Sequence, residues 1–108
     1  MNIFVDVAEN KLKDFSIVDS FEATIELLKK HTINIISLNY QLKTEKTGYD
    51  IIKWINNHNK WPKTIVLHLD DPILVERMMQ YILKYKPDNT KVINNLGNAR
   101  NTLKHYML

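Results

Sequence analysis

The sequence predicts an α/β fold in which helices cover both faces of a mostly parallel β-sheet. Short apolar runs rich in β-branched residues alternate with longer segments whose apolar residues recur at helical spacing. Two of these runs, INIISL at 33–38 and TIVLHL at 64–69, are apolar along most of their length, which is typical of strands covered on both faces. The length of 108 residues suits a single domain, residues 1–108.

Five apolar runs are expected to form the strands of this sheet. They are residues 2–6, 15–18, 33–38, 64–69 and 91–93. Residues 7–14 are polar and have no regular period, so we expect a loop there in place of the first crossover helix. The alternation of strands and helices after that loop predicts a five-stranded sheet in the order 2-1-3-4-5, as in flavodoxin-like three-layer folds.

The first two expected helices begin at recognisable capping residues. Asp19 or Ser20 is expected to cap the first helix, and Glu22 lies three residues after Asp19, the spacing of a capping box. Thr47 is expected to open the second helix with Asp50 as its capping-box partner. Both helices are therefore predicted to start where a side chain can satisfy free backbone N–H groups.

The apolar faces of the helices follow the helical period. They consist of Phe21, Ile25 and Leu28; of Ile51, Ile52 and Ile55; of Leu74, Met78, Ile82 and Tyr85; and, in a last helix at 95–106, of Leu96, Ala99 and Leu103. Pro72 is expected at the first position of the third helix, where no backbone N–H is needed.

The composition excludes several classes of protein. The formal charge is +3, but the lysines are scattered and do not gather on one face with aromatic residues, so binding to nucleic acid is not expected. Without cysteine there is no disulfide and no thiolate metal site. No apolar run approaches the roughly 18–20 residues that cross a bilayer, and the N-terminus lacks the pattern of a signal peptide. We therefore expect a cytoplasmic protein that does not associate with membranes.

Polar residues follow the strands of the predicted sheet. Ligands of such sheets bind beyond the carboxyl ends of the strands, where the strand order reverses. The residues at those ends are Asp6, Asn39, Tyr40, Gln41, His68, Asp70, Asp71, Asn94 and Asn95. Thr47 joins them because the N-terminus of a helix favours an anionic group.

Several segments of the chain resemble one family. The matching segments are IFVD at 3–6, ISL at 36–38, TGYDIIKWI at 47–55, His68 followed by Asp71 and Pro72, and Met78 in the next helix. In these segments the chain resembles the cyclic-phosphate processing receiver domains, small relatives of response-regulator receivers that are proposed to act on cyclic phosphates of nucleotides or related molecules. The resemblance covers residues 2–82 and implies a receiver-like fold.

The departures from the family pattern fall on the reactive groups. Where the family has Asp-His-Asp after the third strand, this chain has Asn39, Tyr40 and Gln41, and a single acid, Asp6, replaces the pair after the first strand. In a receiver the third-strand acid accepts a phosphoryl group and the first-strand acids hold magnesium. An amide forms no acyl phosphate, and one carboxylate is a poor site for an ion that requires octahedral oxygen coordination. We therefore expect no metal, no cofactor and no signalling through phospho-aspartate.

These residues predict a protein that binds a ligand without converting it. The expected ligand-binding residues are Asp6, Asn39, Tyr40, Gln41, Thr47, His68, Asp70 and Asp71. The resemblance implies a nucleotide or a cyclic phosphate as the ligand, on which Tyr40 can stack while the amides form hydrogen bonds. If weak phosphodiesterase activity remains, His68 is the candidate catalytic acid or base.

Structural roles are also open for several of these residues. His68 can satisfy backbone groups at its strand end, and Asp71 can cap the helix that begins at Pro72. Trp54 and Trp61 are expected to cover the core in preference to stacking on a base. As an alternative function, the chain can be an interaction module that uses a helix face to bind a protein partner or a second copy of itself.

Overall fold

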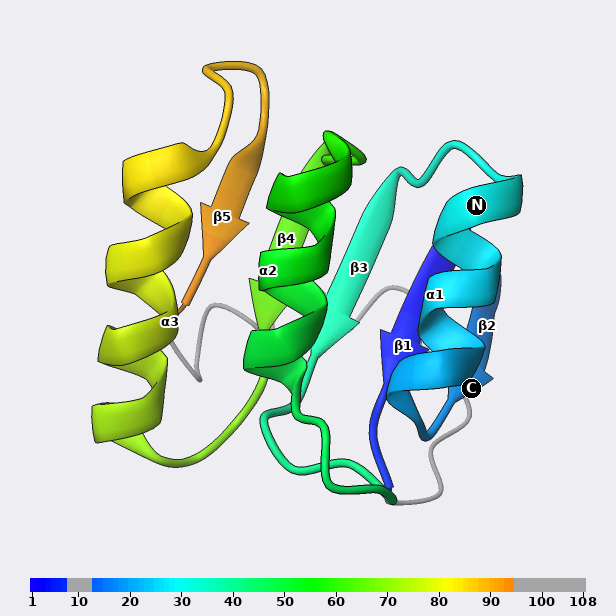
Figure 1. Ribbon diagram of the computed structural model, residues 1–108, viewed down its shortest axis with the longest axis horizontal. Coiled ribbons are helices and arrows are strands. Elements are labelled where there is room, and N and C mark those ends of the chain that lie inside the picture. Colours follow the sequence, from blue (N-terminus) through cyan, green and yellow to red (C-terminus); the bar gives the residue numbers. More distant parts are fainter. Residues whose placement is uncertain (8–12, 95–108) are drawn as a thin grey trace.

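The computed structural model describes residues 1–7 and 13–94 (Figure 1). The strands in this part are β1 (Asn2–Val5), β2 (Phe15–Val18), β3 (Ile35–Leu38), β4 (Thr64–Leu67) and β5 (Lys91–Ile93). The helices are α1 (Phe21–Lys30), α2 (Gly48–His58) and α3 (Pro72–Tyr85). None of the helices in the described ranges is long and apolar enough to cross a membrane.

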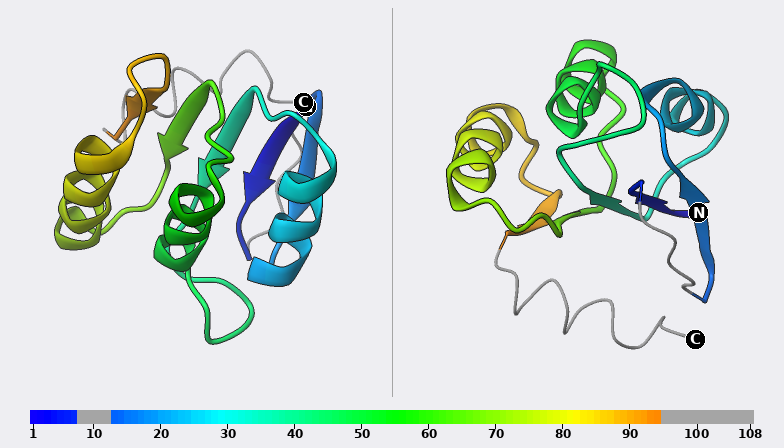
Figure 2. Two further views of the ribbon diagram at one scale, coloured as in Figure 1. Left: turned by 45° about the horizontal axis from the view of Figure 1, so that its top comes forward. Right: turned by 90° about the horizontal axis from the view of Figure 1, so that it is seen from below.

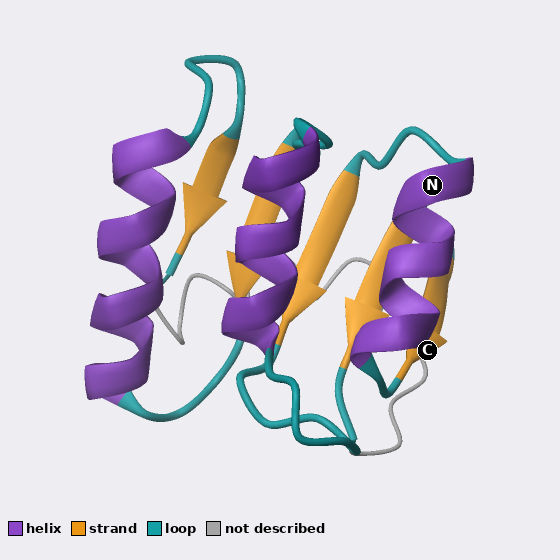
Figure 3. Cartoon of the chain, in the orientation of Figure 1, coloured by secondary structure: helices purple, strands orange, loops and turns teal. Residues whose placement is uncertain are grey.

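The strands form one sheet in the order β2-β1-β3-β4-β5, and every neighbouring pair is parallel. This order confirms the prediction, with a pairing that is parallel throughout (Figure 3). Leu38 of β3 lies opposite both Val5 of β1 and Leu67 of β4. The carboxyl ends of the three central strands therefore lie at one edge of the sheet, where the sequence predicts the site.

The three described helices all lie on one face of the sheet, as the right-hand view of Figure 2 shows. The sequence predicts helices on both faces, and the helix expected at 95–106 lies outside the described residues. Residues 8–12, in the loop predicted at 7–14, also lie outside them. The helix layer that the structure describes is thus formed by α1, α2 and α3.

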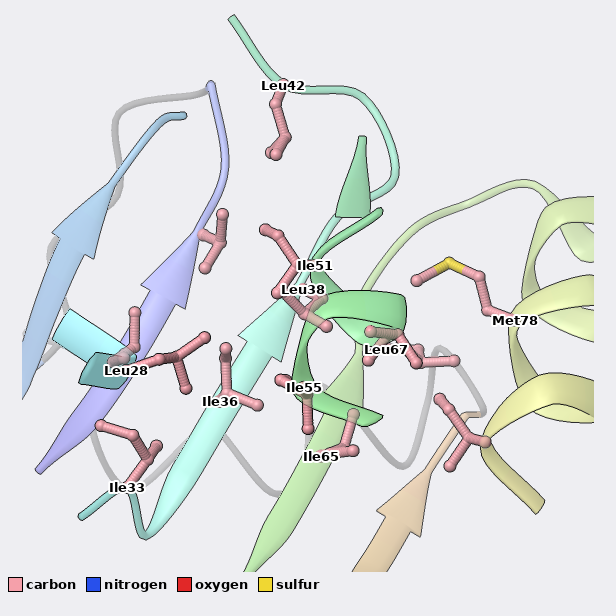
Figure 4. Packing of buried hydrophobic residues seen from close by; sticks show 14 of the residues in the cluster. Leu28, Ile33, Ile36, Leu38, Leu42, Ile51, Ile55, Ile65, Leu67 and Met78 are labelled. Carbon is pink, nitrogen blue, oxygen red and sulfur yellow. The ribbon is translucent and has the colours of Figure 1, made fainter. Parts of the chain in front are cut away.

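The main hydrophobic core lies between the sheet and this helix layer (Figure 4). Alternate strand residues point into it, because successive side chains of a strand face opposite sides. Its fully buried members include Ile36, Leu38, Ile65, Leu67, Ile51, Ile52, Ile55, Met78 and Ile82. Burying a side chain of this size stabilises the fold by about 1.5–3 kcal/mol. Trp54 and Trp61 pack partly buried against this core, as predicted.

The opposite face of the sheet carries a smaller buried cluster. Its members are Phe4 of β1, Ile35 of β3 and Val66 of β4. Ser37 is two residues after Ile35 in β3 and is fully buried. The same alternation places Asp6, two residues after Phe4, and His68, two residues after Val66, on this face of the sheet.

The helices begin at the predicted capping residues, with one difference. Thr47 and Asp50 form the capping box of α2: Asp50 Oδ2 accepts a hydrogen bond from Thr47 N at 2.8 Å, and Thr47 Oγ1 accepts one from Asp50 N at 3.4 Å. Ser20 caps α1, accepting a bond from its first turn at 3.1 Å. Glu22 is then the second helical residue, so the box predicted from Asp19 does not form, because it requires the third position.

Three of the expected strands are longer than the observed ones. β1 ends before Asp6 and β4 ends before His68, so both residues follow their strands directly, and β3 begins at Ile35, two residues later than expected. Tyr85, predicted on the buried face of α3, is 43% exposed. Tyr85 is the last residue of α3, and its ring packs on Tyr81, with ring centroids 4.7 Å apart.

Candidate functional site

Four side chains at the carboxyl ends of β1, β3 and β4 are joined by hydrogen bonds. His68 Nε2 lies 2.9 Å from Asp6 Oδ2, and His68 Nδ1 lies 2.6 Å from Ser37 Oγ. Asn39 Nδ2 donates to the second Asp6 oxygen, Oδ1, at 3.1 Å. We call Asp6, Ser37, Asn39 and His68 the strand-end network.

His68 is enclosed within this network. Its ring stacks on Phe4 with centroids 4.4 Å apart and planes 9° apart, and its side chain is 12% exposed. Burial lowers the pKa of His68, and the hydrogen bond and charge of Asp6 oppose that shift. Because a carboxylate only accepts, neutral His68 donates from Nε2 to Asp6 and accepts at Nδ1 from the Ser37 hydroxyl. Both ring nitrogens are therefore engaged inside the protein.

Ser37 is absent from the predicted site, although the sequence contains a signal for it. It is a hydroxyl residue in the otherwise apolar strand IISL, and a buried hydroxyl requires a hydrogen-bond partner. The partner is the His68 side chain. His68 thus binds two side chains, whereas the structural role considered for it from the sequence involved backbone groups.

A hollow of about 290 Å³ lies beside the network, between the loop after β3 and the start of α3. Its lining residues are Asn39, Tyr40, Gln41, Leu69, Asp70, Asp71 and Leu74, and we call it the strand-end hollow. It brings together most of the predicted ligand-binding residues, while Asp6 and His68 are not among those that line it. Asp71 also caps α3 as predicted, since its Oδ1 accepts hydrogen bonds from Ile73 N and Leu74 N at 3.0 and 3.3 Å.

The loop that presents Tyr40 is held at both ends. Asn39 Oδ1 accepts a hydrogen bond from Tyr40 N at 2.8 Å, and Tyr40 O accepts one from Gly48 N at 2.8 Å. A Cβ atom at Gly48 would overlap the carbonyl oxygen of Asn39. Glycine is therefore required where α2 begins against the end of β3.

A second hollow, of about 480 Å³, lies between the first turns of α2 and the middle of α3. Its lining residues are Tyr40, Glu45, Thr47, Tyr49, Asp50, Lys53 and Arg77, and we call it the α2–α3 hollow. Thr47, predicted to share a crevice with the strand ends, lines this hollow instead. Tyr40 lines both hollows, so they adjoin each other at this residue.

Five residues of the α2–α3 hollow are absent from the predicted site: Glu45, Tyr49, Asp50, Lys53 and Arg77. Tyr49 and Lys53 are four residues apart on α2, and Lys53 Nζ lies 4.6 Å from the centre of the Tyr49 ring. That spacing places the two residues on one side of a helix, which is a signal available in the sequence. Arg77 comes from α3, and its approach to Lys53 depends on how the two helices pack.

The residues at the strand ends do not fit the magnesium ion of a receiver. Asp6 already accepts hydrogen bonds from His68 and Asn39, and the Asn39 amide nitrogen that faces it is a donor. Among residues 1–7 and 13–94, no group of three or more His, Cys, Asp or Glu side chains is arranged to hold a metal ion. The amide of Asn39 likewise offers no oxygen anion for attack on a phosphoryl group.

A fully parallel sheet in this order, with polar groups at the carboxyl ends of its central strands, defines a receiver-like domain. The family model described as cyclic-phosphate processing receiver domain matches residues 1–84. The chain belongs to this family, as its sequence motifs predict. A search of curated proteins and a search of solved structures found no match.

Proposed function

We propose that this protein is a family member that binds a nucleotide or cyclic-phosphate ligand at the carboxyl ends of its strands without converting it. The observation that carries the proposal is the contrast at that edge of the sheet. An open hollow is lined by Tyr40 and the exposed amide of Gln41, while the neighbouring imidazole of His68 has both nitrogens engaged.

The arrangement of His68 argues against turnover. Opening a cyclic phosphate needs a group that takes a proton from water and a group that protonates the leaving oxygen. His68 can serve in either role only after its bond to Ser37 or to Asp6 opens. Its ring is also stacked on Phe4 and mostly buried, so a substrate has little access to it.

The strand-end hollow supports recognition by stacking and hydrogen bonding. Tyr40 is partly buried, and its loop is fixed at both ends, which limits the entropy lost when a planar base packs against its ring. Gln41 is exposed in the lining and carries both a donor and an acceptor. Asp70 is exposed beside it and can accept hydrogen bonds from hydroxyl or amino groups.

A thermal-shift screen with nucleoside 2′,3′-cyclic phosphates, cyclic dinucleotides and mononucleotides tests this function. A ligand at 100 times its Kd stabilises the folded state by about 2.7 kcal/mol, or roughly 10 °C for a domain of this size. We expect Tyr40→Ala to abolish the shift, and Tyr85→Ala, at the far end of α3, to retain it. Chromatography of the recovered ligand should find it unchanged, and a converted product would contradict the proposal.

An exposed apolar surface on α3 supports interaction with a protein as a second candidate function. Ile73 and Leu83 are 71% and 58% exposed. A hollow of about 520 Å³ lies along the same helix and is lined largely by apolar residues, among them Pro72, Val75 and Met79. Absence of any thermal shift in the screen, together with a concentration-dependent dimer in sedimentation, would favour this candidate over ligand binding.

A further inference from the structure

We propose, resting on the proposed function, that the ligand spans both hollows, with its phosphate against Lys53 and Arg77 and its nucleoside part in the strand-end hollow. The two hollows share Tyr40 as a wall, so one molecule can contact both. In this orientation the phosphate points away from the strand-end network.

Charge distinguishes the two hollows. The strand-end hollow is lined by two carboxylates, Asp70 and Asp71, and by no cation, which gives a formal charge of −2. The α2–α3 hollow contains two cations, Lys53 and Arg77, and two carboxylates, which gives a formal charge of zero. A phosphate is repelled in the first hollow and meets cationic partners in the second, so the difference between them sets the direction of the ligand.

The two carboxylates of the α2–α3 hollow do not oppose a phosphate equally. Asp50 Oδ2 accepts hydrogen bonds from the backbone N–H and the hydroxyl of Thr47, at 2.8 and 3.3 Å, so part of its charge is compensated at the helix N-terminus. Glu45 is exposed to solvent, where salt and water screen its charge. The strand-end hollow holds a matching pair, the capping Asp71 and the exposed Asp70, so the two hollows differ in their cations and not in their carboxylates.

The cations suit a phosphate for different reasons. Arg77 has a planar guanidinium group whose parallel N–H donors match two phosphate oxygens. Lys53 is held beside the hollow by the Tyr49 ring, 4.6 Å from its ammonium nitrogen. Together they place two positive charges from two helices on one side of Tyr40.

The strand-end hollow suits the nucleoside part for the opposite reason. Ribose hydroxyls and base amino groups are donors, and the exposed Asp70 carboxylate accepts from them. Gln41 can accept and donate, so it can bind the edge of a base. The acidic lining that disfavours phosphate in this hollow is therefore favourable for the uncharged half of the same ligand.

Isothermal titration tests this orientation with the four nucleoside 2′,3′-cyclic phosphates, the four matching nucleosides and inorganic phosphate as probes. We expect Arg77→Ala and Lys53→Ala each to weaken binding of the bound cyclic phosphate about tenfold, because each removes a charge-assisted bond. Nucleoside affinity should stay the same in both variants. Lys84→Ala is the control. It removes a cation that is exposed, as Lys53 and Arg77 are, but lies near the other end of α3, and it should bind every probe as the wild type does.

A reciprocal variant sharpens the result. Asp70→Asn should change the affinity for the nucleoside and for the cyclic phosphate by the same factor, because the phosphate is placed elsewhere. A selective gain for the cyclic phosphate in Asp70→Asn, or wild-type affinity in both Arg77→Ala and Lys53→Ala, would overturn the orientation and leave the proposed function standing. If the wild type binds none of these probes, this inference fails, and the proposed function fails as well if the thermal-shift screen, which also contains cyclic dinucleotides and mononucleotides, finds no ligand.

Discussion

The strand-end network and the two hollows beside Tyr40 are both polar and lie next to each other, yet they use their polar groups differently. In the network, the ring nitrogens of His68 and both oxygens of Asp6 are bonded within the protein. In the hollows, Gln41, Lys53 and Arg77 are exposed to solvent. The comparison separates polar groups that hold the central strands together from polar groups that are available to a ligand.

A polar residue at a strand end is therefore not necessarily available to a ligand. Asp6 and His68 directly follow central strands, but their side chains bond to each other and to Asn39 and Ser37. Lys53 and Arg77 lie on helices, away from the strand ends, and yet line a hollow. Under the proposed function, exposure and free bonding capacity therefore select Gln41, Lys53 and Arg77 in preference to Asp6 and His68.

The largest expected effect comes from Gly48, which packs against the backbone of Asn39 and donates its N–H to Tyr40 O. Gly48→Ala places a methyl group on the backbone oxygen of Asn39, so the start of α2 must move away from β3. We expect a loss of about 3 kcal/mol in the free energy of unfolding, measured by urea denaturation. Asn57→Ala, on the exposed side of the same helix, should lie within about 0.5 kcal/mol of the wild type. Equal stability of the two variants would mean that α2 does not contact β3 as closely as described.

A smaller effect is expected from His68. Its replacement should weaken the strand-end network and leave ligand binding in the hollows unchanged. His68→Ala removes the stacking on Phe4, the partner of the buried Ser37 hydroxyl and one partner of Asp6. The expected loss is about 2 kcal/mol of stability, with ligand affinity retained at a temperature where the variant is folded. His58→Ala, an exposed histidine stacked on Trp54, is the matched control and should change stability little. Loss of ligand binding in a stable His68→Ala protein would place His68 in the binding site.

The smallest expected effect is the dependence of stability on pH. The pKa of folded His68 is lowered by burial, so the unfolded chain binds more protons than the folded one below the ordinary histidine pKa of about 6.5. The free energy of unfolding should therefore fall as the pH decreases through 6.5 toward the lower pKa of the folded state. The difference between wild type and His68→Gln, followed by urea denaturation from pH 8 to pH 5, isolates this contribution. If the wild type instead gains stability relative to His68→Gln as the pH falls from 8 to 5, the pKa of folded His68 is raised and this prediction is wrong.

Much of the fold follows from local patterns in the sequence. The continuous apolar runs around Ile36 and Ile65 predict strands buried on both faces, and this is how β3 and β4 are found. The capping box at Thr47 and the cap at Asp71 are also visible, because they depend on residues only two to four positions apart. The sequence does not select the cap of α1, because Asp19 and Ser20 are both good capping residues and only the helix geometry selects Ser20.

The candidate site could be predicted only in part. The rule for parallel sheets locates Tyr40, Gln41 and Asp70 at the correct edge, and these three residues do line one hollow. The rule does not say which side chains bond to one another, so it includes His68 in the site without its partner Ser37. It also omits Arg77, whose place beside Tyr40 depends on the packing of α3 next to α2.

By itself, the sequence determined the order of the elements, the parallel sheet, the family and the edge at which polar residues collect. It did so because hydrophobic periodicity, capping and turn chemistry act over short stretches of chain. Only the tertiary structure decided which of those polar residues face inward and which remain open. That division depends on contacts between residues far apart in sequence, such as His68 with Asp6, whose geometry is set when the strands pair and the helices pack on them.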